Sequence, residues 1–171
     1  TYTAPGLVNG DTLSGALSTA ATAYVMGAAG SASNVGAYAI SQGSLTASAN
    51  YTVTFVAGTL TVNPVALTIT ASSQSVVYGA GTTLSGTAFT SSGLVNGDTV
   101  SSVLATYNNI ATVNVLTNAG TYANAIVLSA ASGAGLSNYT LQYATGDLVV
   151  MPATLTAVSY THLTLPTILL V

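Results

Sequence analysis

Four side chains in this sequence of 171 residues could take part in acid–base or metal chemistry near neutral pH: Asp11, Asp98, Asp147 and His162. A Ser-His-Asp hydrolase triad could be assembled from these residue types, but the Gly-x-Ser-x-Gly nucleophile motif does not occur. With no cysteine and no lysine or arginine, thiolate ligation and cationic electrophilic catalysis are excluded. We therefore expect no enzyme and assign no catalytic, cofactor-binding or metal-binding residues.

The motif Asn-Gly-Asp occurs at residues 9–11 and again at residues 96–98, which first suggests calcium. Calcium prefers six to eight oxygen ligands with several carboxylates, whereas each motif supplies a single carboxylate. A tight turn followed by an aspartate that caps a helix accounts for the motif equally well, and we favour that interpretation.

Two other patterns have structural explanations. Asn50-Tyr51-Thr52 and Asn138-Tyr139-Thr140 fit the N-glycosylation sequon, but both lie where a strand is expected to begin. The aromatic pairs Tyr38/Tyr122, Tyr51/Tyr139 and Phe55/Tyr143 recur at matching strand phase, which favours packing over carbohydrate stacking.

The composition excludes several classes of partner. Charged residues make up 2% of the chain and the formal net charge is −3. Without lysine or arginine, the chain has no cationic side chain of the kind that binds the phosphates of nucleic acids or anionic lipids. Half of the residues are hydrophobic, but Thr, Ser, Asn and Gly interrupt them before they reach the roughly 20 apolar residues of a membrane helix. We expect no nucleic-acid binding and no membrane insertion.

An internal repeat organises the chain. The motif Gly-Leu-Val-Asn-Gly-Asp-Thr at residues 6–12 recurs at residues 93–99, and the Asn-Tyr-Thr motif recurs 88 residues after its first occurrence. We predict a first repeat over residues 1–64 that lacks its opening segment, a complete repeat over residues 65–152, and the start of a third over residues 153–157.

Each repeat is predicted to be mainly β. Residues 66–70 and 139–143 alternate apolar and polar side chains, and a hairpin returns through residues 148–150. After Asp11 and Asp98 the apolar spacing becomes i, i+3, i+4, as in Val100, Val103 and Leu104. We therefore predict one short helix in each repeat, beginning at these aspartates.

These motifs resemble the MBG domains of bacterial surface adhesins, of the type named after a Tyr-Gly-X motif, here Tyr78-Gly79-Ala80. The recurring Gly-Leu-Val-Asn-Gly-Asp-Thr segment, the Asn-Tyr-Thr strand starts and the closing hairpins complete the resemblance, which covers residues 1–157. The first repeat departs from it, since the chain begins after the position of the Tyr-Gly-X motif.

The resemblance implies tandem β-grasp-like modules, each a small sheet with one short helix (α+β); the alternative is immunoglobulin-like β-sandwich repeats. It implies secreted, filamentous-haemagglutinin-like adhesins at the bacterial cell surface, in which these repeats form a non-catalytic stalk or spacer. The alternative function is direct cell adhesion to a host glycan or protein. The expected partners are neighbouring repeats of the same chain.

Residues 158–171 do not continue the repeat. Residues 158–167 resemble the translation of a transposon-end sequencing adapter, so we interpret residues 158–171, including His162, as a non-native tail. The alternative is a divergent third repeat. We expect an extended, poorly packed tail whose deletion leaves stability unchanged within about 0.5 kcal/mol.

Strand order adds three expectations. In β-grasp topology residues 67–70 pair in parallel with residues 148–150. Tyr139, Leu141 and Tyr143 share the buried face, opposite Thr140 and Gln142. In the first repeat the closing strand, residues 60–62, keeps one unpaired edge, so residues 1–64 are expected to show either frayed order or pairing with a non-native strand.

Overall fold

The protein is a chain of short β-strands with almost no helix. The computed structural model describes residues 1–23, 25–26, 28–108, 110 and 113–159. One 3₁₀ turn, η1 (Leu136–Asn138), is the helical element in these residues. The strands are β1 (Ser18–Thr19), β2 (Gly36–Ser41), β3 (Gly58–Val62), β4 (Val65–Ala71), β5 (Gln74–Val77), β6 (Phe89–Ser92), β7 (Thr99–Tyr107), β8 (Gly120–Ala134), β9 (Tyr139–Ala144) and β10 (Gly146–Met151).

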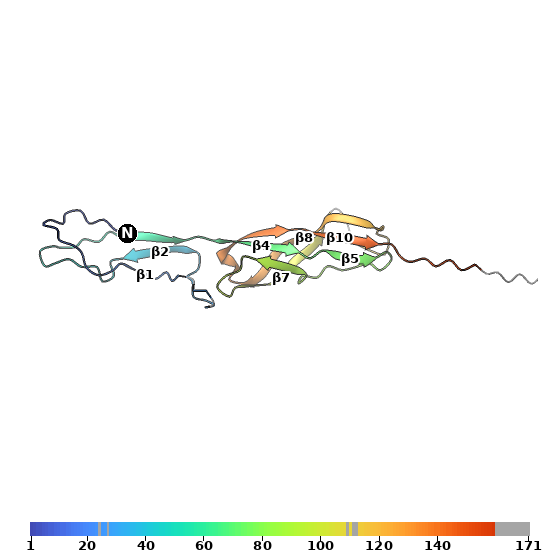
Figure 1. Ribbon diagram of the computed structural model, residues 1–171, viewed down its shortest axis with the longest axis horizontal. Coiled ribbons are helices and arrows are strands. Elements are labelled where there is room, and N and C mark those ends of the chain that lie inside the picture. Colours follow the sequence, from blue (N-terminus) through green and yellow to red (C-terminus); the bar gives the residue numbers. More distant parts are fainter. Residues whose placement is uncertain (24, 27, 109, 111–112, 160–171) are drawn as a thin grey trace, which may run out of the picture.

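The strands form three sheets. One sheet, ordered β1-β2-β3, belongs to the first repeat, and two sheets, ordered β5-β10-β8-β7 and β6-β4-β9, belong to the second. Figure 1 shows the repeats one after the other along the long axis, with the first at the left. The mainly β class predicted from the sequence is confirmed.

The hydrophobic core lies in the second repeat. Leu67 and Ile69 of β4 are fully buried and cluster with Val103, Ile126, Leu128 and Tyr139, which come from β7, β8 and β9. The cluster therefore joins the two sheets of this repeat across their faces. A second cluster, around Leu148 and Val150 of β10, extends the core toward the far end of the repeat. Both clusters contact β8, the longest strand.

The two repeats share one register in an antiparallel strand pair, β2 with β3 in the first and β8 with β10 in the second. Tyr38 of β2 is opposite Leu60 of β3, and Tyr122 of β8 is opposite Leu148 of β10. Gly36 and Gly120 likewise face Val62 and Val150. The internal repeat seen in the sequence is thus also a repeat of strand pairing.

The predicted pairing of residues 67–70 with residues 148–150 is wrong. β4 pairs in parallel with β9 and antiparallel with β6, whereas β10 pairs in parallel with β5 in the other sheet. The chain changes sheets at Ser72-Ser73, so the opening segment supplies one strand to each sheet. The β-grasp topology is not confirmed, because it depended on that pairing.

The predicted helices after Asp11 and Asp98 are also wrong. Residues 99–107 form β7, whose pairing with β8 shifts register between Val100 and Ser102 and again between Ser102 and Leu104. A bulge moves the buried phase of a strand by one residue, so Val100 and Val103 both turn inward, three residues apart. The helical spacing was the signature of a bulged strand. After Asp11 the chain is extended, and Ser14 forms a bridge with Thr46.

The predicted hairpin of residues 139–143 with residues 148–150 is wrong, because β9 and β10 lie in different sheets and do not pair with each other. In the first repeat, residues 51–55 form no strand that could pair with β3.

Other expectations for the strands are met in part. In β9, Tyr139 is buried and Leu141 half-buried while Thr140 and Gln142 are exposed, although Tyr143 retains 37% exposure. β3 pairs with β2 on one side and is an edge strand in the described part of the chain. Leu45 is the one fully buried hydrophobic residue found in the described part of the first repeat, so the complete repeat is the better packed.

Of the predicted tail, residues 158–171, the structure describes residues 158 and 159, which are exposed and lie outside any helix or strand. Residues 152–159 form no helix or strand, and Leu155 and Val158 are 92% and 87% exposed. His162 and residues 160–171 lie outside the described residues.

Candidate functional site

Each Asn-Gly-Asp motif forms a tight turn. Asn9 and Gly10 both have positive φ angles, 56° and 77°, and Asn96 and Gly97 have nearly the same values, 60° and 78°. The Asp11 amide donates to the Val8 carbonyl at 3.0 Å, and Asp98 repeats this contact with Val95. Two successive positive φ angles define a type I′ turn, which asparagine and glycine adopt at the lowest cost.

The aspartate of each turn accepts a hydrogen bond from a tyrosine of the same repeat. The Tyr51 hydroxyl donates to Asp11 Oδ2 at 2.6 Å, and the Tyr139 hydroxyl donates to Asp98 Oδ2 at 2.9 Å. The same hydroxyls lie 3.1 and 2.9 Å from the backbone amides of Val8 and Val95, which donate to them. We call this recurring arrangement the Tyr–Asp turn.

The Tyr–Asp turn accounts for the chemistry of both motif aspartates. A half-buried carboxylate accepts a phenol hydroxyl, and the phenol oxygen accepts a backbone amide, so the donors and acceptors satisfy one another. In the second repeat the carboxylate of Asp98 lies against Gly135, where a side chain would meet it directly. The arrangement fastens the turn to Tyr139, the first residue of β9, in the second repeat and to Tyr51 in the first.

The third aspartate has a separate structural contact. Asp147 Oδ1 accepts the backbone amide of Asn124 at 2.8 Å, at the register shift between β10 and β8. Asn124 itself has a positive φ of 54°. Asp147 therefore supports an irregular point of the sheet.

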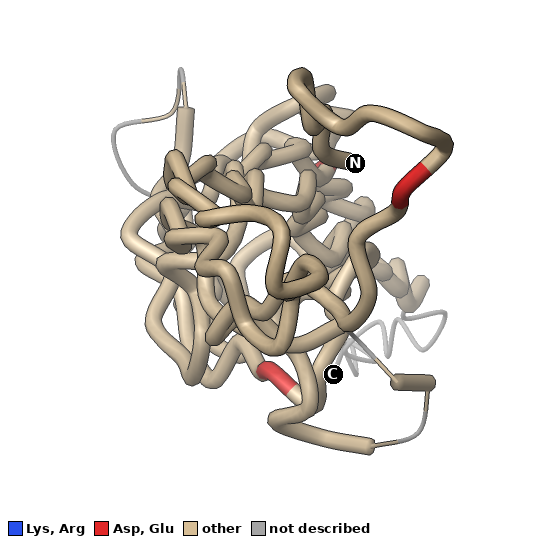
Figure 2. Tube along the Cα trace, turned by 90° about the vertical axis from the view of Figure 1, so that its left-hand side faces the viewer, with Lys and Arg blue, Asp and Glu red and all other residues tan. Residues whose placement is uncertain are grey.

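The described residues hold no group of three or more His, Cys, Asp or Glu side chains that could bind a metal ion. In Figure 2 the aspartates, in red, are spread over different parts of the trace. The Ser-His-Asp possibility depended on His162, which lies outside the described residues. Within the described part of the chain, no helix combines the length and the hydropathy needed to cross a bilayer.

The paired aromatic residues serve mainly as packing and hydrogen-bonding groups. Tyr38 and Tyr122 both donate to a carbonyl four residues earlier, Asn34 at 2.7 Å and Asn118 at 2.9 Å. The Tyr143 hydroxyl accepts the amide of Ala131 at 3.0 Å. Internal bonding of the tyrosine hydroxyls agrees with the packing interpretation of these residues.

The Tyr-Gly-X motif ends β5. Ala80 donates its amide to the Val77 carbonyl at 3.0 Å, and Gly79 in between has a φ of 90°, as the third residue of a type II turn requires. The amide of Tyr78 donates to the Met151 carbonyl at 2.8 Å and so extends the pairing of β5 with β10.

Two asparagines of the second repeat hold the first repeat. Asn96 accepts the amide of Gly30 on its backbone carbonyl at 2.8 Å and the amide of Ala32 on its side-chain oxygen at 3.1 Å. Asn138 Oδ1 accepts the amide of Val35 at 2.9 Å, and Asn138 Nδ2 donates to Asn34 Oδ1 at 3.0 Å. We call this contact the joint.

The joint gives a structural role to Asn138, the asparagine of the second sequon. From the sequence, this residue was expected only to lie where a strand begins. The joint also uses Asn96, the central residue of the Tyr–Asp turn, so one motif serves both the fold of a repeat and its attachment to the preceding one. A hollow of about 470 Å³ lies beside the joint, with Val35, Leu60, Val62 and Tyr139 among its lining residues. The recurrence of both asparagines was visible in the sequence, but their neighbours were not.

Comparison with known proteins gives one match. The MBG domain (YGX type) family matches residues 1–61 and 67–149. No curated protein and no solved structure matches the chain. The family is consistent with a repeat module of surface proteins.

Proposed function

Because the chain belongs to the MBG domain (YGX type) family, we propose that it is a non-catalytic spacer segment of a large secreted bacterial surface adhesin. In this role tandem repeats set the distance between the cell surface and a more distal part of the adhesin. The partners of each repeat are its neighbours in the same chain.

The joint is the observation that carries this proposal. Four hydrogen bonds cross between the repeats, and two residues, Asn63 and Pro64, separate β3 from β4. A short linker with a proline restricts rotation, and directional hydrogen bonds fix the remaining orientation. A spacer requires such a restricted joint, because freely jointed repeats would coil and lose reach.

Distance measurement between two spin labels tests the restricted joint. The natural chain has no cysteine, so Thr19→Cys on β1 and Thr106→Cys on β7, both exposed, allow specific labelling. We expect a narrow distance distribution across the repeats. Replacing both joint asparagines, Asn96→Ala with Asn138→Ala, should broaden it.

Asn118→Ala is the matched control, because Asn118 occupies the position of Asn34 in the second repeat and its side chain is exposed. This variant should keep the narrow distribution. A broad distribution in the unmodified chain would contradict the spacer role, because the repeats would then be flexibly linked.

A further inference from the structure

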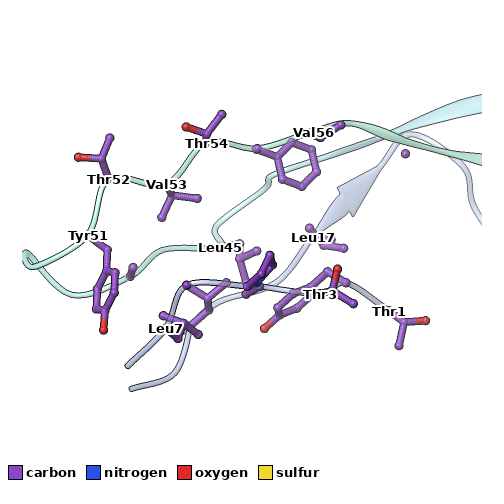
Figure 3. A pocket seen from close by; sticks show the side chains of 18 of the residues that line it. Thr1, Thr3, Leu7, Leu17, Leu45, Tyr51, Thr52, Val53, Thr54 and Val56 are labelled. Carbon is purple, nitrogen blue, oxygen red and sulfur yellow. The ribbon is translucent and has the colours of Figure 1, made fainter. Parts of the chain in front are cut away.

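The first repeat contains a large open groove. Its volume is about 840 Å³, and its lining includes Tyr2, Leu7, Leu45, Tyr51, Val53 and Phe55. Figure 3 shows Tyr51 and Val53 turned toward the side that carries Leu7 and Leu45, while Thr52 and Thr54 point away. Residues 51–55 thus have the alternation of a strand, with half-buried and exposed side chains in turn, but they form no strand.

The second repeat shows what belongs in this position. Residues 51–55 correspond to β9, and residues 2–5 correspond to β6, by the same offsets that relate the motifs. In the second repeat β4 lies between β6 and β9 and bonds to both. Leu67 and Ile69 of β4 fill the space between the layers and are fully buried. The groove is therefore the space that β4 occupies in the complete repeat.

A second vacancy lies nearby, along β3. Its counterpart β10 has β8 on one side and β5, in parallel, on the other. Among the strands of the described residues, β3 has β2 on one side and none on the other. Leu60 consequently keeps 40% exposure, whereas the equivalent Leu148 is fully buried. Unpaired strand edges of this kind readily accept a further strand.

One continuous segment fills both positions in the second repeat. β4 and β5 are separated only by Ser72 and Ser73, where the chain passes from one sheet to the other. The groove and the free edge of the first repeat are therefore two parts of a single vacancy.

We propose that the first repeat is a receptor for one extended segment with the pattern of residues 65–77, which inserts a β4-like strand into the groove and lays a β5-like strand along β3. The register of the second repeat transfers directly: Leu67 of the segment falls opposite Val53, Ile69 opposite Phe55, and Val76 opposite Val62. The occupant is uncharged and alternates aliphatic and hydroxyl side chains. The groove itself contains no ionisable side chain other than tyrosine, which favours an uncharged segment.

A synthetic peptide with the sequence of residues 65–77 tests the proposal with the full chain. We expect binding at one peptide per chain, measured by calorimetry. Hydrogen exchange should slow at the amides of residues 51–55 and 60–62 together, because one segment covers both. A peptide with Ile69→Asp should bind at least about 100-fold more weakly, because it would bury an unpaired charge.

A pair of protein variants locates the site. Val53→Asp faces the groove and should abolish binding, whereas Asn50→Asp, at an exposed residue outside the groove lining, should preserve it. If Val53→Asp unfolds the first repeat, slowed exchange along residues 60–62 of the unmodified chain still decides the question.

Three results would overturn the proposal. The peptide could bind no more tightly than its Ile69→Asp version. It could protect only the second repeat, which would mean that it displaces β4 there. The free chain could already form dimers with residues 51–55 protected, in which case a second copy occupies the groove. None of these results changes the spin-label distances measured across the joint. The spacer role and the receptor role can therefore fail separately.

Discussion

At the scale of single residues, the Tyr–Asp turn shows how a chain with three carboxylates uses two of them. Asp11 and Asp98 bond to tyrosines 40 and 41 residues later in the sequence. The contact links the turn of each repeat to the segment that begins at its tyrosine, which is β9 in the second repeat and residues 51–55 in the first. Hydrogen bonds to a charged acceptor contribute more to stability than neutral ones. Because the sequence has no lysine or arginine, hydrogen bonds to a carboxylate are the strongest polar contacts available among the described residues.

Tyr139→Phe should destabilise the second repeat by about 1.5–3 kcal/mol, because it leaves the half-buried Asp98 carboxylate and the Val95 amide short of a partner. Chemical denaturation followed by tyrosine fluorescence or circular dichroism measures the effect. Tyr78→Phe, which removes the hydroxyl of a 43% exposed tyrosine, is the control and should change stability by less than about 0.5 kcal/mol. Equal effects of the two variants would refute the importance of the Tyr–Asp turn.

Tyr107 should make the second repeat sensitive to alkali. Its hydroxyl oxygen is buried between the two core clusters, and this burial raises the pKa of the phenol above 10, against a smaller opposing effect of the Thr82 hydroxyl. A raised pKa means that the folded state favours the protonated form. The stabilising contribution is complete below about pH 10, the unfolded pKa, and is lost as pH rises through the folded pKa.

Tyr107→Phe should therefore retain more of its neutral-pH stability above about pH 10 than the unmodified chain, as judged by melting temperature at each pH. Tyr78→Phe provides the comparison, because it removes an exposed phenol. If both variants lose stability in parallel with the unmodified chain, alkaline unfolding arises from overall charge repulsion instead.

At the scale of elements, period-2 alternation identified the strands that lie flat on the core. Residues 66–70 and 139–143 were predicted as strands and form β4 and β9. The same reasoning failed for the bulged strand β7, because its register shifts place buried side chains at helical spacing. The sequence also did not show which sheet each strand joins, since β4 and β10 have similar alternation but lie in different sheets.

The candidate site was predictable only in part. The recurrence of Asn-Gly-Asp and Asn-Tyr-Thr marked the right residues, and the Asn-Gly pair correctly indicated a tight turn. Their partners are 40 to 104 residues away in the sequence, as with Asp11 and Tyr51 or Asn138 and Asn34. Such contacts depend on which strands become neighbours, and a single sequence does not determine that directly.

Leu141→Asp should destabilise the second repeat by several kcal/mol, because Leu141 packs against the core cluster of β4 and β8. Gln142→Asp, on the exposed face of the same strand, should stay within about 0.5 kcal/mol. Thermal unfolding of both variants gives the comparison. If Leu141→Asp melted like the unmodified chain, the assignment of this face to the core would be wrong.

At the scale of the whole molecule, the two repeats are unequal. Most of the fully buried side chains found in the described residues belong to the second repeat, and the first leaves a groove where its counterpart holds two buried aliphatic residues. The two repeats otherwise share the turn, the Tyr–Asp contact and the register of one antiparallel pair, β2–β3 or β8–β10. The difference in packing coincides with the positions that β4 and β5 occupy in the second repeat.

Supplying those strands covalently should equalise the repeats. Residues 65–87 precede the counterpart of Thr1 in the second repeat, so this sequence fused ahead of Thr1 has the natural spacing to reach both the groove and the edge of β3. Burying one leucine and one isoleucine stabilises by about 1.5–3 kcal/mol each, so the first repeat should gain several kcal/mol before the ordering cost of the segment is subtracted. Hydrogen exchange of residues 36–41, in β2, measures this gain within the first repeat.

A fusion carrying aspartate at both positions equivalent to Leu67 and Ile69 is the matched control and should leave exchange of β2 unchanged. The joint should hold in both fusions, because its asparagines belong to the second repeat. A fused segment that slowed exchange equally with and without the two aliphatic side chains would show that added chain length alone protects β2. The groove would then not be a strand-binding site, and the inequality of the repeats would need another cause.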